Sequence, residues 1–254
     1  MDKIDRRPKP MVSHQHRFVV VWSPKSACTS ATIWFMTAND HLDAMQAYGR
    51  WPHDYRIQVY YHLPEITKGM GGDLLDYFYL KIIRDPFSRV VSSFKQGIHT
   101  GYLNNNLARY LGRQVDDTHG YSFTEFLDYL ETIDLANTNP HHGLQRHPVE
   151  DVRDMDCVIN VSTEDLYEGL NRFEDRMGLP QTNFAEFDLI HQIQNRRKSK
   201  LWDIGTADVS DLPISKNELR QNGFFSPELL LNDHNRSRIR SLYAVDLEQY
   251  RDYL

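Results

Sequence analysis

The chain has 254 residues, of which 40% are hydrophobic and 25% charged, and its formal net charge is -6. This composition is typical of a soluble globular protein with enough length for one large domain, and the negative charge argues against a nucleic-acid partner. No stretch approaches the ~18 apolar residues of a membrane span, and the first residues lack the apolar core of a signal peptide. We therefore expect a cytoplasmic protein without an integral membrane segment.

The first predicted element is a buried β-strand, FVVVW, over residues 18–22. The run is short and β-branched and ends at Ser23-Pro24, which is typical of a strand inside a parallel sheet. Residues 31–38 follow as a predicted helix that Thr29 and Ser30 could cap. Residues 1–16 are expected to form a flexible arm.

Two further strands are predicted, RIQVYYH over residues 56–62 and YFYLKII over 77–83. The second is followed at once by Arg84-Asp85-Pro86, and proline suits the first turn of a helix. That helix has apolar residues at three- and four-residue spacings and is expected to end near Gly97 or Gly101.

The remaining predictions are a capped helix over 122–130, a strand over 156–162, a helix over 163–178 and a final helix over 235–254. Residues 182–231 have weak periodicity and are expected to form long loops. Strands alternate with helices, and no linker or repeat divides the chain. The sequence therefore predicts a single α/β domain over 1–254 with a central, mainly parallel sheet flanked by helices.

A candidate anion site lies in SPKSACTSA, residues 23–31, between the first strand and its helix. Backbone N–H groups and the helix dipole favour a bound phosphate or sulfate there, and Lys25, Thr29 and Ser30 add side-chain donors. The segment lacks the pattern GxxxxGK[ST], which disfavours ATP hydrolysis. The alternative is an ordinary strand-to-helix turn with a surface lysine.

A second candidate anion site lies in RDPFSRVVSS, residues 84–93. Arg84 ends a predicted strand and Ser92 lies on the following helix, so their side chains could converge on one phosphate. The alternative is a structural pair between Arg84 and Asp85.

Together, PKSACTS (24–30) and RDPFSRVVSSF (84–94) resemble two motifs of the sulfotransferases that use 3′-phosphoadenosine 5′-phosphosulfate (PAPS). The closest similarity is to the Golgi-type carbohydrate branch, which includes heparan sulfate 2-O-sulfotransferase. It extends through NPHHGLQ (139–145), INVSTEDL (159–166) and LYAVDLEQY (242–250). Because a membrane anchor and lumenal disulfides are not evident, a bacterial or viral cytoplasmic relative is expected, with Cys28 and Cys157 as free thiols.

The resemblance implies a P-loop-nucleotide-kinase-like sulfotransferase fold and a set of donor-binding residues. Around the 5′-phosphosulfate it places Lys25, Ser26, Ala27, Cys28, Thr29 and Ser30. It assigns Arg84 and Ser92 to the 3′-phosphate, and a basic run with Arg197 or Lys200 could close over that phosphate. The resemblance implies no metal, because lysine, arginine and backbone donors meet the charge of PAPS.

The expected reaction moves a sulfuryl group from PAPS to a hydroxyl or amino group, by in-line displacement with a histidine base. Lys25 would stabilise charge on the departing phosphate. We favour His62 as the base, because it ends a predicted strand and lies 22 positions before Arg84 (84 − 62), as in the resembling enzymes. Glu65 is the alternative base, and His141 could line the acceptor cleft.

The expected acceptor is an oligosaccharide or polysaccharide, while tyrosyl peptides, small molecules and the oligomeric state are left open. Two rival functions remain. A kinase or other phosphotransferase also uses a strand-loop-helix, although the missing GK[ST] ending argues against it. A noncatalytic PAPS-binding module would keep the site without turnover.

Overall fold

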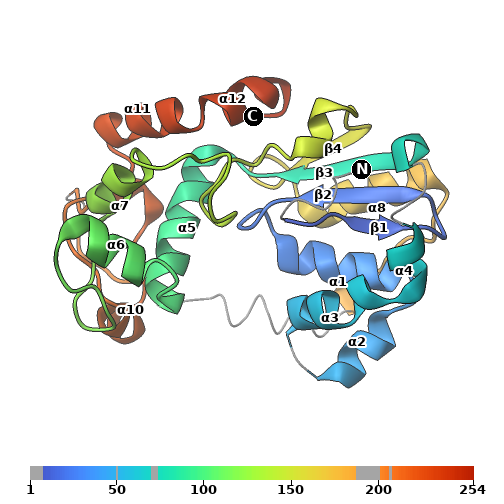
Figure 1. Ribbon diagram of the computed structural model, residues 1–254, viewed down its shortest axis with the longest axis horizontal. Helices are drawn as coiled ribbons and strands as arrows, with labels where there is room; N and C mark the ends of the chain where they lie inside the picture. Colours follow the sequence, from blue (N-terminus) through green and yellow to red (C-terminus); the bar gives the residue numbers. More distant parts are fainter. Residues whose placement is uncertain (1–7, 50, 70–73, 187–200, 206–207) are drawn as a thin grey trace. The chain divides into compact units, whose positions relative to one another are not determined.

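The computed structural model describes residues 8–49, 51–69, 74–186, 201–205 and 208–254 (Figure 1). The chain divides into two compact units. The first consists of Met1–Arg84, Gln145–Ile193 and Asp252–Leu254, and the second of Asp85–Leu144 and Gln194–Arg251. The chain therefore leaves the first unit after Arg84 and returns to it at Gln145.

Among the described residues, the sheet of the first unit has four strands in the order β1-β2-β3-β4 (Figure 1). β2 (Phe18–Trp22), β3 (Phe78–Ile83) and β4 (Cys157–Asn160) run parallel, and β1 (Met11–Ser13) is antiparallel to β2. The carboxyl ends of β2 and β3 meet at one edge of the sheet, since Trp22 pairs with Ile82. The structure confirms an α/β fold with a mainly parallel sheet and flanking helices.

Both faces of β2 are buried, which explains why its sequence is continuously apolar. Phe18 and Val20 belong to a cluster with α1 (Cys28–Ala38) and α8 (Leu166–Met177). Val19 and Val21 join a second cluster with residues of the 3-10 helices η2 (Leu74–Asp76) and η3 (Pro148–Asp151). Successive side chains of a strand point to opposite faces, so β2 lies between two layers.

The segment over 56–62 is helical, so its prediction as a strand is wrong. It forms the end of α3 (Pro52–Gln58) and a 3-10 helix, η1 (Tyr60–His62). Pro52 occupies the first turn, and Pro52, Tyr55, Arg56 and Tyr60 are buried at helical spacing, whereas Ile57 is 46% exposed. The helical spacing that starts at Pro52 overrides the strand-like run RIQVYYH.

The N-terminal arm is also partly structured. Met11 and Val12 are buried in β1, and Tyr60 donates a hydrogen bond to the carbonyl oxygen of Val12 at 2.7 Å. The prediction of a flexible arm over 1–16 is therefore wrong for β1, because its apolar side chains complete the sheet edge. α2 (Leu42–Tyr48) and α4 (Pro64–Gly69) are the other helices of this part of the chain.

In the described residues, the second unit is built mainly of helices. They are α5 (Pro86–Thr100), α6 (Asn104–Leu111), α7 (Phe123–Leu130), α10 (Lys216–Asn222), α11 (Asp233–Leu242) and α12 (Ala244–Gln249). The core contains Phe94, whose ring meets Tyr121 and Phe123 edge-on. The final predicted helix breaks at Tyr243, and a 3-10 helix, η6 (Arg251–Tyr253), follows α12.

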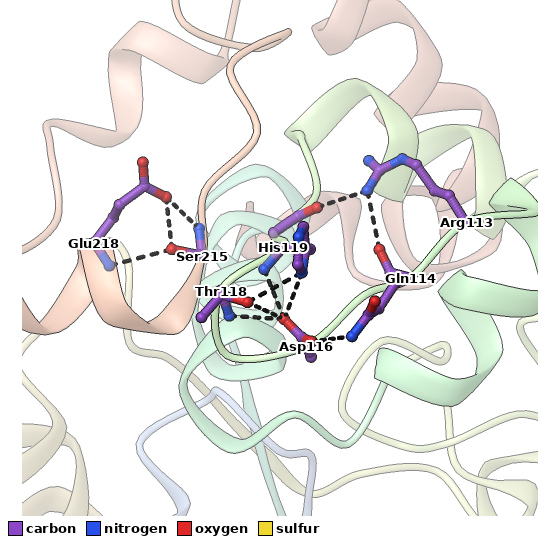
Figure 2. Close-up of polar contacts among 8 residues, drawn as sticks. Arg113, Gln114, Asp116, Thr118, His119, Ser215 and Glu218 are labelled. Carbon is purple, nitrogen blue, oxygen red and sulfur yellow. Dashed lines mark hydrogen bonds and ion pairs between the residues drawn. The ribbon is translucent and has the colours of Figure 1, made fainter.

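A compact polar turn precedes α7 in the second unit (Figure 2). The Asp116 carboxylate accepts hydrogen bonds from the His119 N–H and from the hydroxyl and N–H of Thr118, and these bonds hold the pKa of Asp116 well below its usual range. Beside it, Ser215 and Glu218 form the capping box that begins α10.

The prediction of long loops over 182–231 is wrong at α10 and at the 3-10 helices η4 (Phe184–Glu186) and η5 (Pro227–Leu230).

Candidate active site

The loop between β2 and α1 has an unusual backbone. Of the four non-glycine residues with positive φ in the described chain, two lie here: Lys25 at 71° and Ala27 at 54°. Side chains make this left-handed region unfavourable, so the surrounding structure must hold it in place. Turns of this kind make concave anion sites from backbone N–H groups.

Helix α1 starts inside the predicted anion site. Its N-cap is Ala27, which makes no side-chain cap, and Cys28, Thr29 and Ser30 form its first turn. The prediction that Thr29 and Ser30 cap the helix is therefore wrong, because both lie within it. The first-turn N–H groups and the positive end of the helix dipole lie together at the loop, which favours a bound anion.

Arg84 directly follows the carboxyl end of β3 and reaches the loop. Its guanidinium donates a hydrogen bond to the carbonyl oxygen of Lys25 at 3.2 Å. Within the first unit, Arg84 of the second predicted anion site therefore contacts the first predicted site.

A histidine that the sequence analysis did not select also contacts this loop. His53 Nε2 lies 3.1 Å from Thr29 Oγ1 and 3.7 Å from Cys28 Sγ. The His53 ring stacks on Trp22, the last residue of β2, with ring centroids 6.2 Å apart. The sequence did contain a signal, since Trp51-Pro52 marks a helix start that puts His53 in the first turn.

Arg56 lies one turn after His53 on the same face of α3. Its side chain stacks over Trp22 at 4.1 Å from the ring centroid, and it donates to Thr32 Oγ1 at 3.1 Å. Burial lowers the pKa of Arg56, and the facing Tyr61 and Cys28 oppose that shift. Helix α3 therefore contacts the start of α1 through His53 and both β2 and α1 through Arg56.

His62 and Glu65 lie at the surface of the first unit, in η1 and in the first turn of α4. Because η1 is helical, His62 does not end a strand, and that argument for its role is wrong. No contact among the described residues joins either side chain to the loop. Their catalytic assignments stay predictions.

A model of the sulfotransferase family matches residues 8–251. The chain belongs to the sulfotransferase family. Family membership makes it a transferase of sulfuryl groups and fits the P-loop-like fold of its first unit. No curated protein and no solved structure matched in the other two comparisons.

Two predicted site residues of this sulfotransferase belong to the second unit. Ser92 is half-buried on α5, and His141 is half-buried with its Nδ1 2.9 Å from Asn139 Oδ1. The predicted convergence of Ser92 with Arg84 and the acceptor role of His141 stay predictions. Arg197 and Lys200 lie outside the described residues.

The segment that carries His141 is held by the buried Arg89 of α5. Its guanidinium donates to the carbonyl oxygens of Gly143 and Pro140 at 2.8 and 3.0 Å. His142 is also buried and stacks on Tyr102. Burial, followed by the charges of Arg89 and His141, lowers the pKa of His142 to about 4.

The described part of the sulfotransferase holds no cluster of three or more His, Cys, Asp or Glu side chains suited to a metal ion. None of its helices is long and apolar enough to cross a membrane. Cys28 and Cys157 are free thiols, as predicted.

Proposed function

We propose that this sulfotransferase uses PAPS as donor and sulfates a hydroxyl or amino group of a carbohydrate. The observation that carries the proposal is the β2–α1 loop, whose left-handed residues and helix N-terminus are suited to bind an anion and which Arg84 contacts. PAPS has a phosphosulfate at one end and a 3′-phosphate at the other, so a donor site needs two joined anion sites. The resemblance of residues 24–30 and 84–94 to the PAPS motifs supports the same donor.

In the proposed donor site, the loop residues Lys25 to Ser30 surround the 5′-phosphosulfate. Arg84 and Ser92 hold the 3′-phosphate, and Arg197 and Lys200 are proposed as further contacts. No metal is required, because the lysine, the arginine and the helix N-terminus supply the positive charge.

The proposed transfer is a single displacement at sulfur. The acceptor oxygen or nitrogen forms a bond to sulfur while the bond from sulfur to the phosphate oxygen breaks. The acceptor proton passes to a base, and 3′-phosphoadenosine 5′-phosphate (PAP) leaves with the electron pair. Lys25 stabilises the negative charge that develops on the departing phosphate.

Two histidines of the first unit are candidates for the base. His62 is supported by its spacing before Arg84, which matches the resembling enzymes, and Glu65 is the carboxylate alternative. His53 is supported by its contact with Thr29. We retain His62 as the proposed base and assign His53 to hold the Thr29 hydroxyl at the 5′-phosphosulfate site.

The acceptor is proposed from the resemblance to the carbohydrate branch, in particular over NPHHGLQ, residues 139–145. His141 lies in that segment, with its ring 5.1 Å from that of Tyr102. Aromatic and imidazole rings are suited to pack against sugar rings. A tyrosyl peptide is the alternative acceptor in the same screen.

The test is a transfer assay with radiolabelled PAPS and a panel of oligosaccharides, polysaccharides and tyrosyl peptides. The proposal predicts sulfate transfer to a saccharide. In His62→Ala, kcat should fall at least about a hundredfold while the affinity for PAP is unchanged. In His53→Ala, both kcat and the affinity for PAP should fall.

The opposite pattern would reassign the base. If His53→Ala lowers only kcat and His62→Ala has wild-type kcat, His53 is the base. Transfer to no acceptor, with tight PAP binding, would favour the noncatalytic module.

A further inference from the structure

Gln145 binds the backbone of Arg84 at two points. Its side-chain oxygen Oε1 accepts a hydrogen bond from the Arg84 N–H at 3.0 Å, and its side-chain nitrogen Nε2 donates to the Arg84 carbonyl oxygen at 2.7 Å. Gln145 is only 2% exposed, so both bonds are shielded from water. A buried amide that satisfies one donor and one acceptor of a single residue fixes the position of that residue.

The same oxygen of Gln145 also faces the β2–α1 loop. The hydroxyl oxygens of Ser23 and Ser26 lie 3.2 and 3.0 Å from Oε1, and 2.9 Å from each other. A carbonyl oxygen has two lone pairs, one of which meets the Arg84 N–H. The hydroxyls can therefore form a chain in which one donates to Gln145 and the other donates to the first.

The main chain of Gln145 is anchored separately. Lys81 on β3 donates to its carbonyl oxygen at 2.6 Å and forms a buried ion pair with Glu150 at 2.5 Å. The Glu150 carboxylate in turn accepts from the His147 N–H at 2.7 Å. Gln145 is thus held by the sheet while its side chain holds Arg84 and the loop.

We propose that Gln145 is a positioning residue that fixes Arg84 relative to the phosphosulfate loop, and so sets the spacing between the two anion sites. The inference rests on the proposed function, because it assigns those sites to the two ends of PAPS. Gln145 touches neither phosphate. Its effect is on ligands that must occupy both sites at once.

The proposal separates ligands with two terminal anions from ligands with one. A nucleotide with a single phosphate binds at one site, so a change in the spacing costs it little. A nucleotide with both phosphates must match a fixed spacing, and loosening that spacing loses the benefit of preorganisation. A side chain needed only for folding would weaken all these ligands alike.

The first experiment compares wild-type protein with Gln145→Leu by calorimetry, using PAP, adenosine 5′-phosphate and adenosine 3′-phosphate. PAP should bind roughly tenfold or more weakly to the variant, while each monophosphate changes by less than about threefold. Asn39→Leu is the matched control. It removes another buried amide of the same unit, which donates to the Phe35 carbonyl oxygen at the other end of α1.

The second experiment uses Gln145→Glu, which has nearly the same shape. At pH 8 its carboxylate would place a second oxygen against the Arg84 carbonyl oxygen, whereas the protonated acid regains a donor there. We compare the PAP affinity of this variant with that of wild type at the same pH. The ratio of variant to wild-type affinity should rise at least about fivefold as the pH is lowered from 8 to 5.5. In Gln145→Leu this ratio should stay constant.

Among the described residues of the first unit, the charged side chains at this position are Lys81 on β3 and its partner Glu150, and the backbones of Arg84 and His147 bind Gln145 and Glu150. All are present in wild type as well, so their titration cancels in the ratio. If Gln145→Leu does not fold, the pH dependence of PAP affinity in Gln145→Glu still tests the proposal.

Equal losses for all three nucleotides, or a flat ratio for Gln145→Glu, would overturn the positioning role while leaving the PAPS site intact. Failure of wild-type protein to bind PAP would instead overturn the proposed function, and the inference with it.

Discussion

Lys25 combines an unfavourable backbone conformation with the proposed charge at the leaving group. Its φ of 71° is one that glycine adopts freely, so Lys25→Gly removes the ammonium group without straining the loop. A unit charge about 4 Å from the developing charge is worth roughly 4 kcal/mol at an effective dielectric near 20. We therefore predict that kcat falls about a thousandfold in Lys25→Gly.

The matched control for Lys25→Gly is Lys216→Ala, which removes a lysine that pairs with Asp117 in the second unit. The measurement for both variants is the rate of sulfate transfer in a single turnover. Wild-type rates in Lys25→Gly would show that this lysine does not stabilise the leaving group.

His142 should make stability depend on pH. Burial lowers its pKa to about 4 in the folded protein, against about 6.5 in the unfolded chain. Between pH 4 and 6.5, His142 is protonated in the unfolded chain but neutral in the folded protein. The folded protein therefore loses stability as the pH falls from 6.5 toward 4. The free energy of unfolding should drop by roughly 3 kcal/mol over this range because of this group.

Urea unfolding at pH 4.5 and 7 tests this prediction in wild type, in His142→Gln and in a control, His119→Gln, which changes an exposed histidine. The pH dependence should become shallower only in His142→Gln. Parallel curves for wild type and His142→Gln would contradict the assigned role of burial.

At the scale of elements, the turn before α7 meets the segment before α10 at Gly120. A Cβ atom at Gly120 would lie 2.0 Å from the backbone carbonyl carbon and oxygen of Ile214. Neither segment can yield easily, because Tyr121 and Ile214 form a β-bridge. Gly120→Ala should therefore lower the free energy of unfolding by about 3 kcal/mol.

The control for Gly120→Ala is Gly112→Ala, since Gly112 has a φ of 64° but no atom within 4 Å of the position that the added methyl group would take. Its cost should be only the strain of a left-handed alanine, about 1 kcal/mol. Equal costs in urea denaturation would show that the close approach to Ile214 does not determine stability.

Elements with local signals could be predicted from the sequence. Ser122 and Glu125 form the expected capping box of α7, and Gly178 ends α8 in the left-handed conformation, as predicted. β2 and β3 could also be predicted: burial on both faces leaves a continuous apolar run in β2, and in β3 the apolar run is interrupted only by Lys81, which is buried in an ion pair with Glu150. Residues 56–62 were not, because their helix begins at Pro52, outside the run that suggested a strand.

The residues of the candidate site likewise divide into those that could be predicted from the sequence and those that could not. The loop from Lys25 to Ser30 and Arg84 could be found because they directly follow strands whose carboxyl ends meet. Gln145 could not, because its partners lie 61 to 122 positions away in the sequence. Such a role is visible only once the chain is folded.

At the scale of the whole molecule, the family match spans residues 8–251 and so includes residues of both units. The residues proposed for the 5′-phosphosulfate all belong to the first unit, whereas Ser92 and His141 belong to the second. The prediction of a single domain over 1–254 stays a prediction. Because PAP binding requires no acceptor, the proposed donor site can be tested by itself.

The most direct test is a calorimetric titration of the purified protein with PAP, with ATP and ADP in parallel and Arg84→Ala as the variant. The account predicts that PAP binds far more tightly than ADP, because only PAP has the 3′-phosphate, and that Arg84→Ala loses most of this preference. A preference for ATP, or no binding of PAP, would contradict the assignment of the β2–α1 loop and Arg84 to PAPS.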